Sequence, residues 1–460
     1  MTLPTAGLEP PFWCVLLASF LRQRGVEVSI IDAEVENLTA KETAERVCSL
    51  SPRLTALVVQ GQNPSATSTP KMDAVHALLE ELDGRFLTAL LGIHPSALPD
   101  RTMAEEKVDF VIRGEGFYTL LGLLTGEVHP PGLCYRSNGD LSYTSLPPLL
   151  QSRELPSGAW DLLPMEKYRA HNWHCFGGLP REPYGVIYTS LGCPYNCSYC
   201  NIKELYNAKP GVRYRAPEEV VKEIDFLVEK YDVKNFKIMD ELFTVNKDHV
   251  SAICDLLIQR KYNLNIWAYG RVATVDENLL VKMRKAGITW LCYGFESSSG
   301  IVRRKVAKRF GQSSLWHAVE LTQNAGIQII GNFIFGLPDD TLETMQDTLV
   351  FAQACNFEYV NFYCAMAYPG SQLYSEMKTK GVAFPETWKD WGQYSYGFVP
   401  LPTATLSSID VLRFRDRAFQ EYFNNPTYLQ MMEKKFGGLT VLEVKEMVKH
   451  PLPRKILGVA

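Results

Sequence analysis

A group of three cysteines constrains this chain more than any other feature of its sequence. Cys193, Cys197 and Cys200 are spaced C-x3-C-x2-C and follow directly on the apolar run 184–190. The residues around and between them include Gly, Pro, Asn and Ser, which favour loops because their backbones and side chains suit turns. The pattern therefore predicts a strand that carries three thiolates into a loop at its end.

The spacing of these cysteines distinguishes among the metal sites that thiolates form. A structural zinc site needs four ligands, usually as two closely spaced pairs, and no matching second pair follows the motif closely. Thiolates also hold iron–sulfur clusters, and three of them on a four-iron cluster leave one iron open to another ligand. Packing cysteines or disulfide partners are the plainer alternative. The favoured prediction is a [4Fe-4S] cluster ligated by Cys193, Cys197 and Cys200.

Composition narrows the class of protein. A chain of 460 residues with 46% hydrophobic content can build ordinary cores in about two to four domains. A net charge of −4, without a Lys/Arg-rich stripe, disfavours a nucleic-acid partner. No leader-like segment or long uncharged run predicts a membrane span, so a cytoplasmic location is expected. The 11 cysteines, mostly in apolar contexts, fit reduced thiols better than a disulfide framework.

Residues 1–125 alternate apolar runs with helical patterns. Such strands, separated by helices, indicate a doubly wound, flavodoxin- or Rossmann-like α/β domain with a parallel sheet. Ligands bind at the carboxyl ends of such strands, where three loops rich in Gly, Ser and Thr lie at 61–68, 92–96 and 114–116. Each loop alone suits a simple turn, but together they favour a large ligand. Strands are expected at 26–32, 54–60, 87–93 and 109–113, and helices at 40–50, 72–82 and 98–106.

Residues 126–183 are rich in Pro, Gly and Ser and are expected to form a linker. One small hairpin is expected at 133–143, because Asn138-Gly139 favours a tight hairpin turn. His171, His174 and Cys175 lie close together further along, with spacing that is wrong for a zinc finger. A contact with substrate or cofactor and a purely structural role both remain open for this group.

From residue 184 to 385 the alternation of strands and helices resumes. Six such units indicate a partial (β/α)6 barrel, whose active site is expected at the carboxyl ends of its strands. After residue 385 the alternation stops, and amphipathic helices at 407–423 and 429–436 predict a helical region over 386–460. The barrel strands are expected at 185–189, 235–240, 264–269, 290–295, 327–335 and 359–365.

The cysteine motif resembles the hallmark of the radical S-adenosylmethionine (SAM) superfamily, including the aromatic Tyr199 just before the last cysteine. The resemblance implies that the open iron chelates SAM and that an electron from the cluster cleaves SAM to a 5'-deoxyadenosyl radical. Chelated SAM still needs carboxylates, a fork-shaped cation and backbone donors. Arg271 suits the methionine carboxylate, and Glu296 suits the ribose or the amine. The expected SAM contacts are Tyr199, Asp240, Arg271, Glu296, Asn332 and Gly336, although Asp240 could equally cap the next helix.

The first domain resembles the cobalamin-binding domain that precedes the barrel in a large class of radical SAM enzymes. The resemblance covers about residues 10–125 and rests on the segments 62–65, 94–96 and 109–116. Two features depart from the family: its usual first strand, ahead of 8–12, is absent, and no D-x-H-x-x-G motif supplies a histidine to cobalt. His94 is therefore expected beside the corrin or in packing. The implied cobalamin contacts are Gln62, Asn63, Ser65, Ser68, Gly92, His94, Gly114, Glu115 and Gly116.

Together these resemblances imply a cobalamin-dependent radical SAM methyltransferase that methylates an unactivated carbon of a small molecule or peptide. An external electron donor of the flavodoxin or ferredoxin type is implied as well. An oxidative cyclase or ring-rearranging enzyme with the same domains is the first alternative, and a non-catalytic binding protein that has lost cobalamin is the second. A methylthiotransferase is disfavoured, because a second cysteine triad and an RNA-binding tail are both missing.

Overall fold

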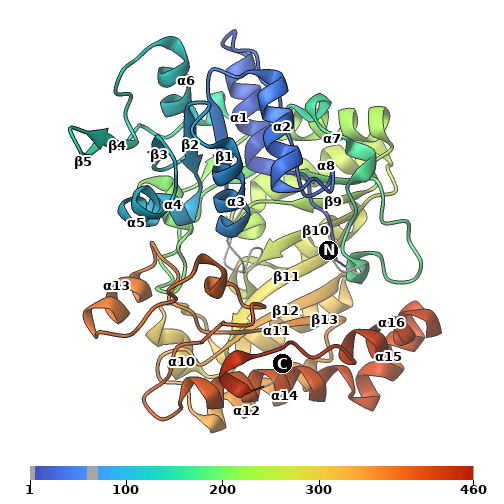
Figure 1. Cartoon of the computed structure of the whole chain (residues 1–460). Coiled ribbons are helices and arrows are strands. Elements are labelled where there is room, and N and C mark those ends of the chain that lie inside the picture. The colour runs from blue at the N-terminus through green and yellow to red at the C-terminus, as the bar shows by residue number, and fades with distance from the viewer. Residues whose placement is uncertain (1–5, 60–70, 459–460) are drawn as a thin grey trace.

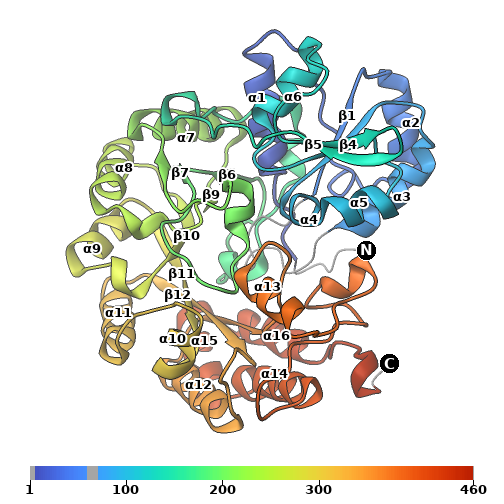
Figure 2. The same cartoon turned by 90° about the vertical axis from the view of Figure 1, so that its left-hand side faces the viewer.

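The structure is a computed structural model that describes residues 6–59 and 71–458. It contains two helix-flanked sheets that lie side by side, and a helical C-terminal region (Figures 1 and 2). The α/β class expected from the alternation of strands and helices is confirmed in both sheets. In the described ranges, no helix combines the length and the apolar character needed to cross a bilayer.

The N-terminal sheet has five strands in the order β1-β2-β3-β4-β5, and β1 to β3 are parallel. Predicted and observed helix bounds agree for α2 and α3, and a capping box of Thr39 and Glu42 begins α2. The parallel strands are β1 (Thr55–Val58), β2 (Thr88–Leu91) and β3 (Phe110–Ile112). The helices are α1 (Phe12–Arg22), α2 (Ala40–Leu50), α3 (Met72–Leu82), α4 (Ile93–Ala97), α5 (Pro99–Glu105) and α6 (Phe117–Thr125).

The strand expected at 26–32 is wrong, because this segment has no regular secondary structure. In a flavodoxin-like sheet of order 2-1-3-4-5, the second strand pairs only with the first. Among the described residues no strand precedes α1. Val26, Val28 and Ile30 therefore pack on the core without a neighbouring strand that could complete a ladder of hydrogen bonds.

The hairpin expected at 133–143 is present as β4 (Leu133–Ser137) and β5 (Asp140–Tyr143). Its two turn residues, Asn138 and Gly139, have φ of +52° and +92°. Positive φ at both central residues is what the tight two-residue hairpin turn requires. β4 pairs antiparallel with β3. The hairpin therefore extends the N-terminal sheet instead of standing apart in a linker.

The second sheet has six parallel strands in the order β6-β9-β10-β11-β12-β13, with helices on its outer side (Figure 2). β6 and β13 are its two edges and do not pair, so the partial (β/α)6 barrel is confirmed. The strands are β6 (Tyr184–Ile187), β9 (Asn235–Ile238), β10 (Asn265–Gly270), β11 (Ile288–Glu296), β12 (Gln328–Phe335) and β13 (Tyr359–Cys364). The helices are α7 (Pro217–Tyr231), α8 (Lys247–Arg260), α9 (Glu277–Lys285), α10 (Gly300–Lys305), α11 (Gln312–Asn324) and α12 (Leu342–Cys355).

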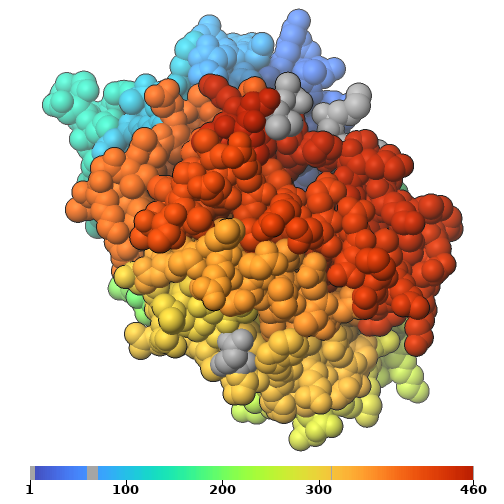
Figure 3. Space-filling view, turned by 90° about the horizontal axis from the view of Figure 1, so that it is seen from below, coloured from blue at the N-terminus to red at the C-terminus, as the bar shows by residue number. Residues whose placement is uncertain are grey.

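The C-terminal region covers the open edge of the barrel. It comprises α14 (Ser408–Phe423), α15 (Pro426–Phe436) and α16 (Gly438–Val448), of which α16 was not expected. Arg415 on α14 donates to the carbonyl of Phe362 on β13 at 2.8 Å. Seen from below, this region forms one continuous surface with the barrel helices (Figure 3). The short α13 (Gln372–Thr379) and the ribbon of β7 (Ser190–Leu191) and β8 (Arg213–Tyr214) complete the α-helices and strands of the part of the chain that the structure describes.

The segment with His171, His174 and Cys175 closes the amino-terminal end of the barrel. Trp173 packs its ring against Trp267 and Trp290, with centroids 5.4 and 5.5 Å away, near the starts of β10 and β11. The cysteine motif leaves the opposite end of the barrel, and none of the three residues lines the pocket there. Of the two roles left open for this group, the structure supports the structural one.

His174 is expected to make the fold sensitive to acid. It is 1% exposed, neither ring nitrogen has a hydrogen-bond partner among the described residues, and burial lowers its pKa to about 3. An unfolded histidine binds a proton near pH 6.5. The unfolded chain therefore binds more protons between about pH 6.5 and 3, and stability falls as pH falls through this window.

At pH 5 this difference costs about 2 kcal/mol. His174→Phe is expected to remove roughly that part of the stability loss between pH 7 and pH 5, measured by urea denaturation of the cluster-free chain. His317→Phe, at an exposed position, is the control and should leave the loss unchanged. An unaltered pH dependence in His174→Phe contradicts the assignment.

Candidate active site

The cysteine loop, defined here as residues 192–201, follows β7 at the carboxyl end of the barrel. Gly192 opens it with φ +102°, and a Cβ there would lie 2.4 Å from the carbonyl oxygen of Gly211, so only glycine fits. Ser198 in the loop donates its N–H to the carbonyl of Val306 at 3.1 Å and accepts from the N–H of Leu373 at 2.8 Å. Barrel segments on two sides therefore hold the loop in place.

The three cysteines are partly exposed and carry free thiols. Burial raises the pKa of Cys193 to about 11 and that of Cys200 to about 12, so these thiols stay protonated until a cation stabilises the thiolates. Among the described residues, no three His, Cys, Asp or Glu side chains are arranged to share one ion. Three cysteines in one loop fit a cluster, in which each thiolate takes a different iron.

One pocket joins these cysteines to the ends of the barrel strands. Four of the six expected SAM contacts line it: Tyr199, Arg271, Glu296 and Asn332. The lining residues are of two chemical kinds. The polar and ionisable ones include Cys193, Cys197, Cys200, Tyr199, Glu241, Arg271, Glu296, Lys308 and Asn332, and the uncharged ones include Leu242, Tyr269, Ile334, Tyr363, Cys364, Met366, Tyr368 and Gln393.

Glu296 is the centre of a buried polar group. It ends β11 with φ +62°, at a register shift between β11 and β12 that turns the strand end. Its Oε1 accepts from the Tyr199 hydroxyl at 2.8 Å and pairs with Lys308, whose side chain is 11% exposed. Lys308 was missed in the sequence, although it belongs to a basic segment, 303–309, that could have drawn attention to it.

Arg271 offers a positive charge to the pocket. Its guanidinium lies over the ring of Tyr195 at 4.0 Å and near that of Phe310 at 5.3 Å, and the residue is 6% exposed. One of its nitrogens donates to the carbonyl of Arg309 at 3.2 Å. No described carboxylate pairs with it, so the cation is available to an anionic group of a ligand.

Asp240 is not among the residues that line the pocket, and its expected contact with SAM stays a prediction. Its carboxylate accepts from the N–H and the hydroxyl of Thr189 and from the hydroxyl of Ser190, each at 2.6 Å, which fixes the start of the cysteine-bearing segment. It does not cap α8 either, because Asn246 does so. Glu241, its neighbour, lines the pocket instead. Burial raises the pKa of Glu241 to about 7.

Gly336 also does not line the pocket. With φ +78° it turns the chain after β12, and a Cβ there would lie 2.6 Å from Val411 of α14, so its role is close packing. Asn332 does line the pocket. Its amide donates to Cys292 Sγ at 3.1 Å, and its Oδ1 accepts from Asn361 at 2.9 Å, so protein partners already orient it.

The residues expected to contact cobalamin are only partly described. Gly92 has φ +135°, and a Cβ there would lie 2.5 Å from the carbonyl of Val59. His94 does not lie in a loop but in α4, buried edge-on against Trp388 and Trp391, and burial lowers its pKa to about 3. Its Nε2 has no partner among the described residues. Gln62, Asn63, Ser65 and Ser68 lie outside the described residues.

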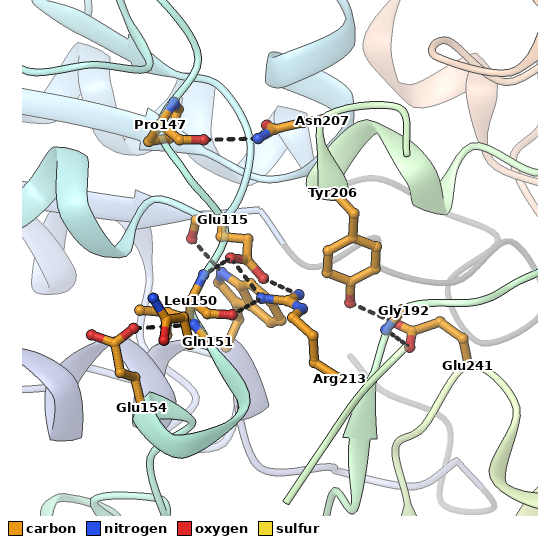
Figure 4. A network of polar contacts seen from close by, with 11 residues as sticks. Glu115, Pro147, Leu150, Gln151, Glu154, Gly192, Tyr206, Asn207, Arg213 and Glu241 are labelled. Atoms are coloured by element: carbon orange, nitrogen blue, oxygen red, sulfur yellow. Dashed lines mark hydrogen bonds and ion pairs between the residues drawn. The ribbon is translucent and has the colours of Figure 1, made fainter. Parts of the chain in front are cut away.

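The expected cobalamin contacts in the loop after β3, Gly114, Glu115 and Gly116, stay predictions, and the structure gives each of them a role within the protein. Gly116 begins α6 with φ +85°, and a Cβ there would lie 2.8 Å from Leu91, so this glycine serves packing. Gly114, with φ +79°, donates its N–H to Ser96. The carboxylate of Glu115 accepts hydrogen bonds from Arg213 and from the N–H of Leu150 (Figure 4). Two features are compatible with a large polar ligand in this domain. The backbone at Gly92 has no room for a side chain, and His94 Nε2 has no partner among the described residues.

Comparison with known proteins agrees with this arrangement. The B12 binding domain family matches residues 2–124, and the Radical SAM superfamily matches residues 187–352. An uncharacterised methyltransferase of Pyrococcus horikoshii is 29% identical over 397 residues, which cover 83% of this chain and 81% of the relative. The anaerobic magnesium-protoporphyrin IX monomethyl ester cyclase of Rubrivivax gelatinosus is 26% identical, over 92% of this chain and 76% of its own.

A solved structure shares the fold. The radical SAM methyltransferase TsrM from Kitasatospora setae, solved with cobalamin and a [4Fe-4S] cluster, superposes with a TM-score of 0.66 at 18% identity, over 81% of this chain and 72% of its own. The B12-binding match precedes the Radical SAM match in this chain, and the second match contains the three cysteines that line the pocket. The chain therefore belongs to the radical SAM enzymes that carry a cobalamin-binding domain.

Proposed function

We propose that this chain is a cobalamin-dependent methyltransferase that methylates an unactivated carbon of a small molecule or peptide. The observation that carries the proposal is a pocket lined by the three motif cysteines, by Arg271, which pairs with no described carboxylate, and by the Glu296–Lys308 pair. A B12-binding domain precedes this pocket in the chain. The Pyrococcus relative, named as a methyltransferase, supports the same reaction class.

Each side chain has a task in this proposal. Cys193, Cys197 and Cys200 hold the cluster, and Arg271 holds the methionine carboxylate of SAM. When bound, the cluster supplies the electron that cleaves SAM to a 5'-deoxyadenosyl radical, and cobalamin carries the methyl group. Tyr199, Glu296 and Lys308 form a preorganised polar group that orients the rest of SAM. Precise orientation matters, because misplacement by about 1 Å can cost about a hundredfold in rate.

The uncharged lining residues of the pocket are suited to the substrate. They include Leu242, Tyr269, Tyr363, Met366 and Tyr368. Such a lining favours an apolar or aromatic part of a substrate and keeps water from a reactive radical. A small molecule or a peptide side chain of this character fits the pocket better than a strongly anionic group does.

The second candidate function is an oxidative cyclisation, which the similarity to the Rubrivivax cyclase favours. The products separate the two reactions. A methyltransferase forms both S-adenosylhomocysteine and 5'-deoxyadenosine, whereas a cyclase forms 5'-deoxyadenosine alone.

The experiment incubates the reconstituted enzyme with SAM labelled at its methyl group, hydroxocobalamin, a reductant and a small-molecule extract of the source cells. We expect a labelled product heavier by about one methylene, together with both SAM products in similar amounts. A product without label, accompanied only by 5'-deoxyadenosine, contradicts methyl transfer.

An external one-electron donor of the flavodoxin type is part of the proposal. The basic segment 303–309 packs on the cysteine loop through the hydrogen bond from the N–H of Ser198 to the carbonyl of Val306. Within it, Arg304, Lys305 and Arg309 are exposed and form a positive surface beside the cluster site. Complementary charges mainly raise the rate of association, so an acidic donor protein is suited to this surface.

Arg304→Glu/Arg309→Glu is therefore expected to slow reduction of the cluster by flavodoxin at least about tenfold at low ionic strength, an effect that salt weakens. Stopped-flow absorbance measures the rate. Reduction by photoreduced deazaflavin should not change. Lys41→Glu/Arg53→Glu, at exposed positions of the N-terminal domain, is the matched control. Equal slowing with both reductants, or equal slowing in the control, contradicts this docking surface.

A further inference from the structure

A buried ion pair connects the N-terminal domain with the cysteine-bearing part of the barrel. Glu115 follows β3, and Arg213 lies on β8; their side chains are 4% and 16% exposed (Figure 4). Arg213 Nη1 donates to Glu115 Oε2 at 3.1 Å and to the carbonyl of Leu150 at 2.9 Å. The N–H of Leu150 donates back to Glu115 Oε2 at 3.1 Å. The side chains of Glu115 and Arg213 and the backbone of Leu150 thus form a closed set of hydrogen bonds between the N-terminal domain and the barrel.

Arg213 is tied directly to the cysteine loop. It pairs with Leu191 in the short ribbon of β7 and β8, two residues before Cys193. Just ahead of it, the N–H of Gly211 donates to the carbonyl of Cys193 at 3.2 Å. A shift of Arg213 therefore moves the backbone that carries the first cysteine.

A second route runs through side chains. The guanidinium of Arg213 lies 5.3 Å from the ring centre of Tyr206, whose hydroxyl donates to Glu241 at 2.7 Å. Glu241 accepts from the N–H of Gly192 at 2.9 Å. In Figure 4 the Tyr206 hydroxyl points toward Gly192 and Glu241, and it lies between these two residues and Arg213. Both routes end at the start of the cysteine loop.

A buried ion pair contributes little to stability, because the cost of desolvating the two charges cancels much of their attraction. Well-packed apolar residues at the same positions often give equal stability. The directional bonds of an ion pair fix geometry instead. Geometry is what a reaction between cofactors in two domains needs, since rates fall steeply with misplacement.

We propose that Glu115 and Arg213 are positioning residues that fix the cysteine loop against the N-terminal domain and transmit occupancy of that domain to the loop. The proposal rests on the proposed function in one respect: it takes the N-terminal domain as the corrinoid site and the cysteine loop as the cluster site. The residues act through the loop and touch no reacting atom.

The chain supplies a matched control two residues further on. Arg215 pairs with Glu223 at 2.7 Å, with side chains 2% and 3% exposed. Glu223 also accepts from the N–H of Gly158 and from the indole N–H of Trp160, so this pair joins α7 to the linker, residues 126–183, and does not reach the N-terminal domain. Glu115→Gln and Glu223→Gln each neutralise one buried carboxylate that faces an arginine of the same short segment.

Hydrogen–deuterium exchange of the anaerobically reconstituted full chain tests the proposal. We expect Glu115→Gln to speed amide exchange at least about threefold over residues 190–214, and Glu223→Gln to leave this region as in the wild type. Added hydroxocobalamin should slow exchange there in the wild type and in Glu223→Gln, but not in Glu115→Gln. A purely structural role of Glu115 would instead speed exchange across the whole N-terminal domain.

Wild-type exchange over 190–214 in Glu115→Gln, or an equal change in Glu223→Gln, overturns the proposal. Where Glu115→Gln does not fold, Arg213→Lys decides, because it keeps the charge but loses the fork of bonds: faster exchange over 190–214 supports the link, and wild-type exchange contradicts it. A wild-type chain that shows no corrinoid absorbance would contradict the proposed function. The difference in exchange between Glu115→Gln and the wild type, measured without corrinoid, would still decide whether Glu115 fixes the cysteine loop.

Discussion

Replacing Cys197 with alanine is expected to abolish the cluster and with it the cleavage of SAM. The cysteine loop offers no fourth cysteine to replace it, because Cys193, Cys197 and Cys200 are the only cysteines of residues 192–201. Changes in the surroundings of a metal ligand already cost about 10–100-fold, so loss of the ligand itself should cost more than about 100-fold in 5'-deoxyadenosine formation. Iron and sulfide contents after anaerobic reconstitution, together with the rate of 5'-deoxyadenosine formation, measure the effect.

Cys364→Ala is the matched control for this prediction. Cys364 lines the same pocket and is 2% exposed, but it lies on β13 and not in the cysteine loop. Its backbone N–H and carbonyl both form hydrogen bonds with the side chain of Gln393. We expect this variant to keep its iron, its sulfide and most of its activity. Retention of a full cluster in Cys197→Ala, or loss of it in Cys364→Ala, would refute the assignment of the ligands.

The second large effect is expected at Lys308. In Lys308→Met the carboxylate of Glu296, whose side chain is 6% exposed, loses its cation and stays buried. Breaking a buried pair on one side costs about 3–5 kcal/mol. We therefore expect the free energy of unfolding to fall by about 3 kcal/mol, measured by urea denaturation of the cluster-free chain. SAM affinity of the reconstituted enzyme should fall at least about tenfold, because the polar group that orients SAM is broken.

The double variant Glu296→Gln/Lys308→Met separates stability from binding. Without a carboxylate there is no buried charge to compensate, so most of the lost stability should return. SAM affinity should stay low, since both groups offered to SAM are gone. A double variant as unstable as Lys308→Met, or a Lys308→Met enzyme that binds SAM as the wild type does, contradicts this account of the pair.

The barrel could be predicted from the sequence because each of its strands is buried on both faces. Such a strand is a predominantly apolar run, as in 327–335, and helices of ordinary length separate one run from the next. The cysteine loop was equally accessible, because local spacing alone carries its signal. The helices α2 and α3 followed from their periodic apolar faces.

What the sequence could not show depends on partners distant along the chain. The run 26–32 has the composition of a strand, but a strand also needs a neighbour. Asp240 and Glu241 are adjacent carboxylates, and only the fold turns the first into the protein and the second into the pocket. Glu115 was expected to meet a corrin, and its arginine partner lies 98 residues away.

Electron paramagnetic resonance of the reduced, anaerobically reconstituted chain, recorded before and after addition of SAM, tests the central claim most directly. Three thiolates that leave one iron open should give the signal of a reduced [4Fe-4S] cluster, and its g values should shift when SAM binds that iron. No cluster signal, a signal indifferent to SAM, or the same signal after Cys193, Cys197 and Cys200 are all changed to alanine would contradict the claim.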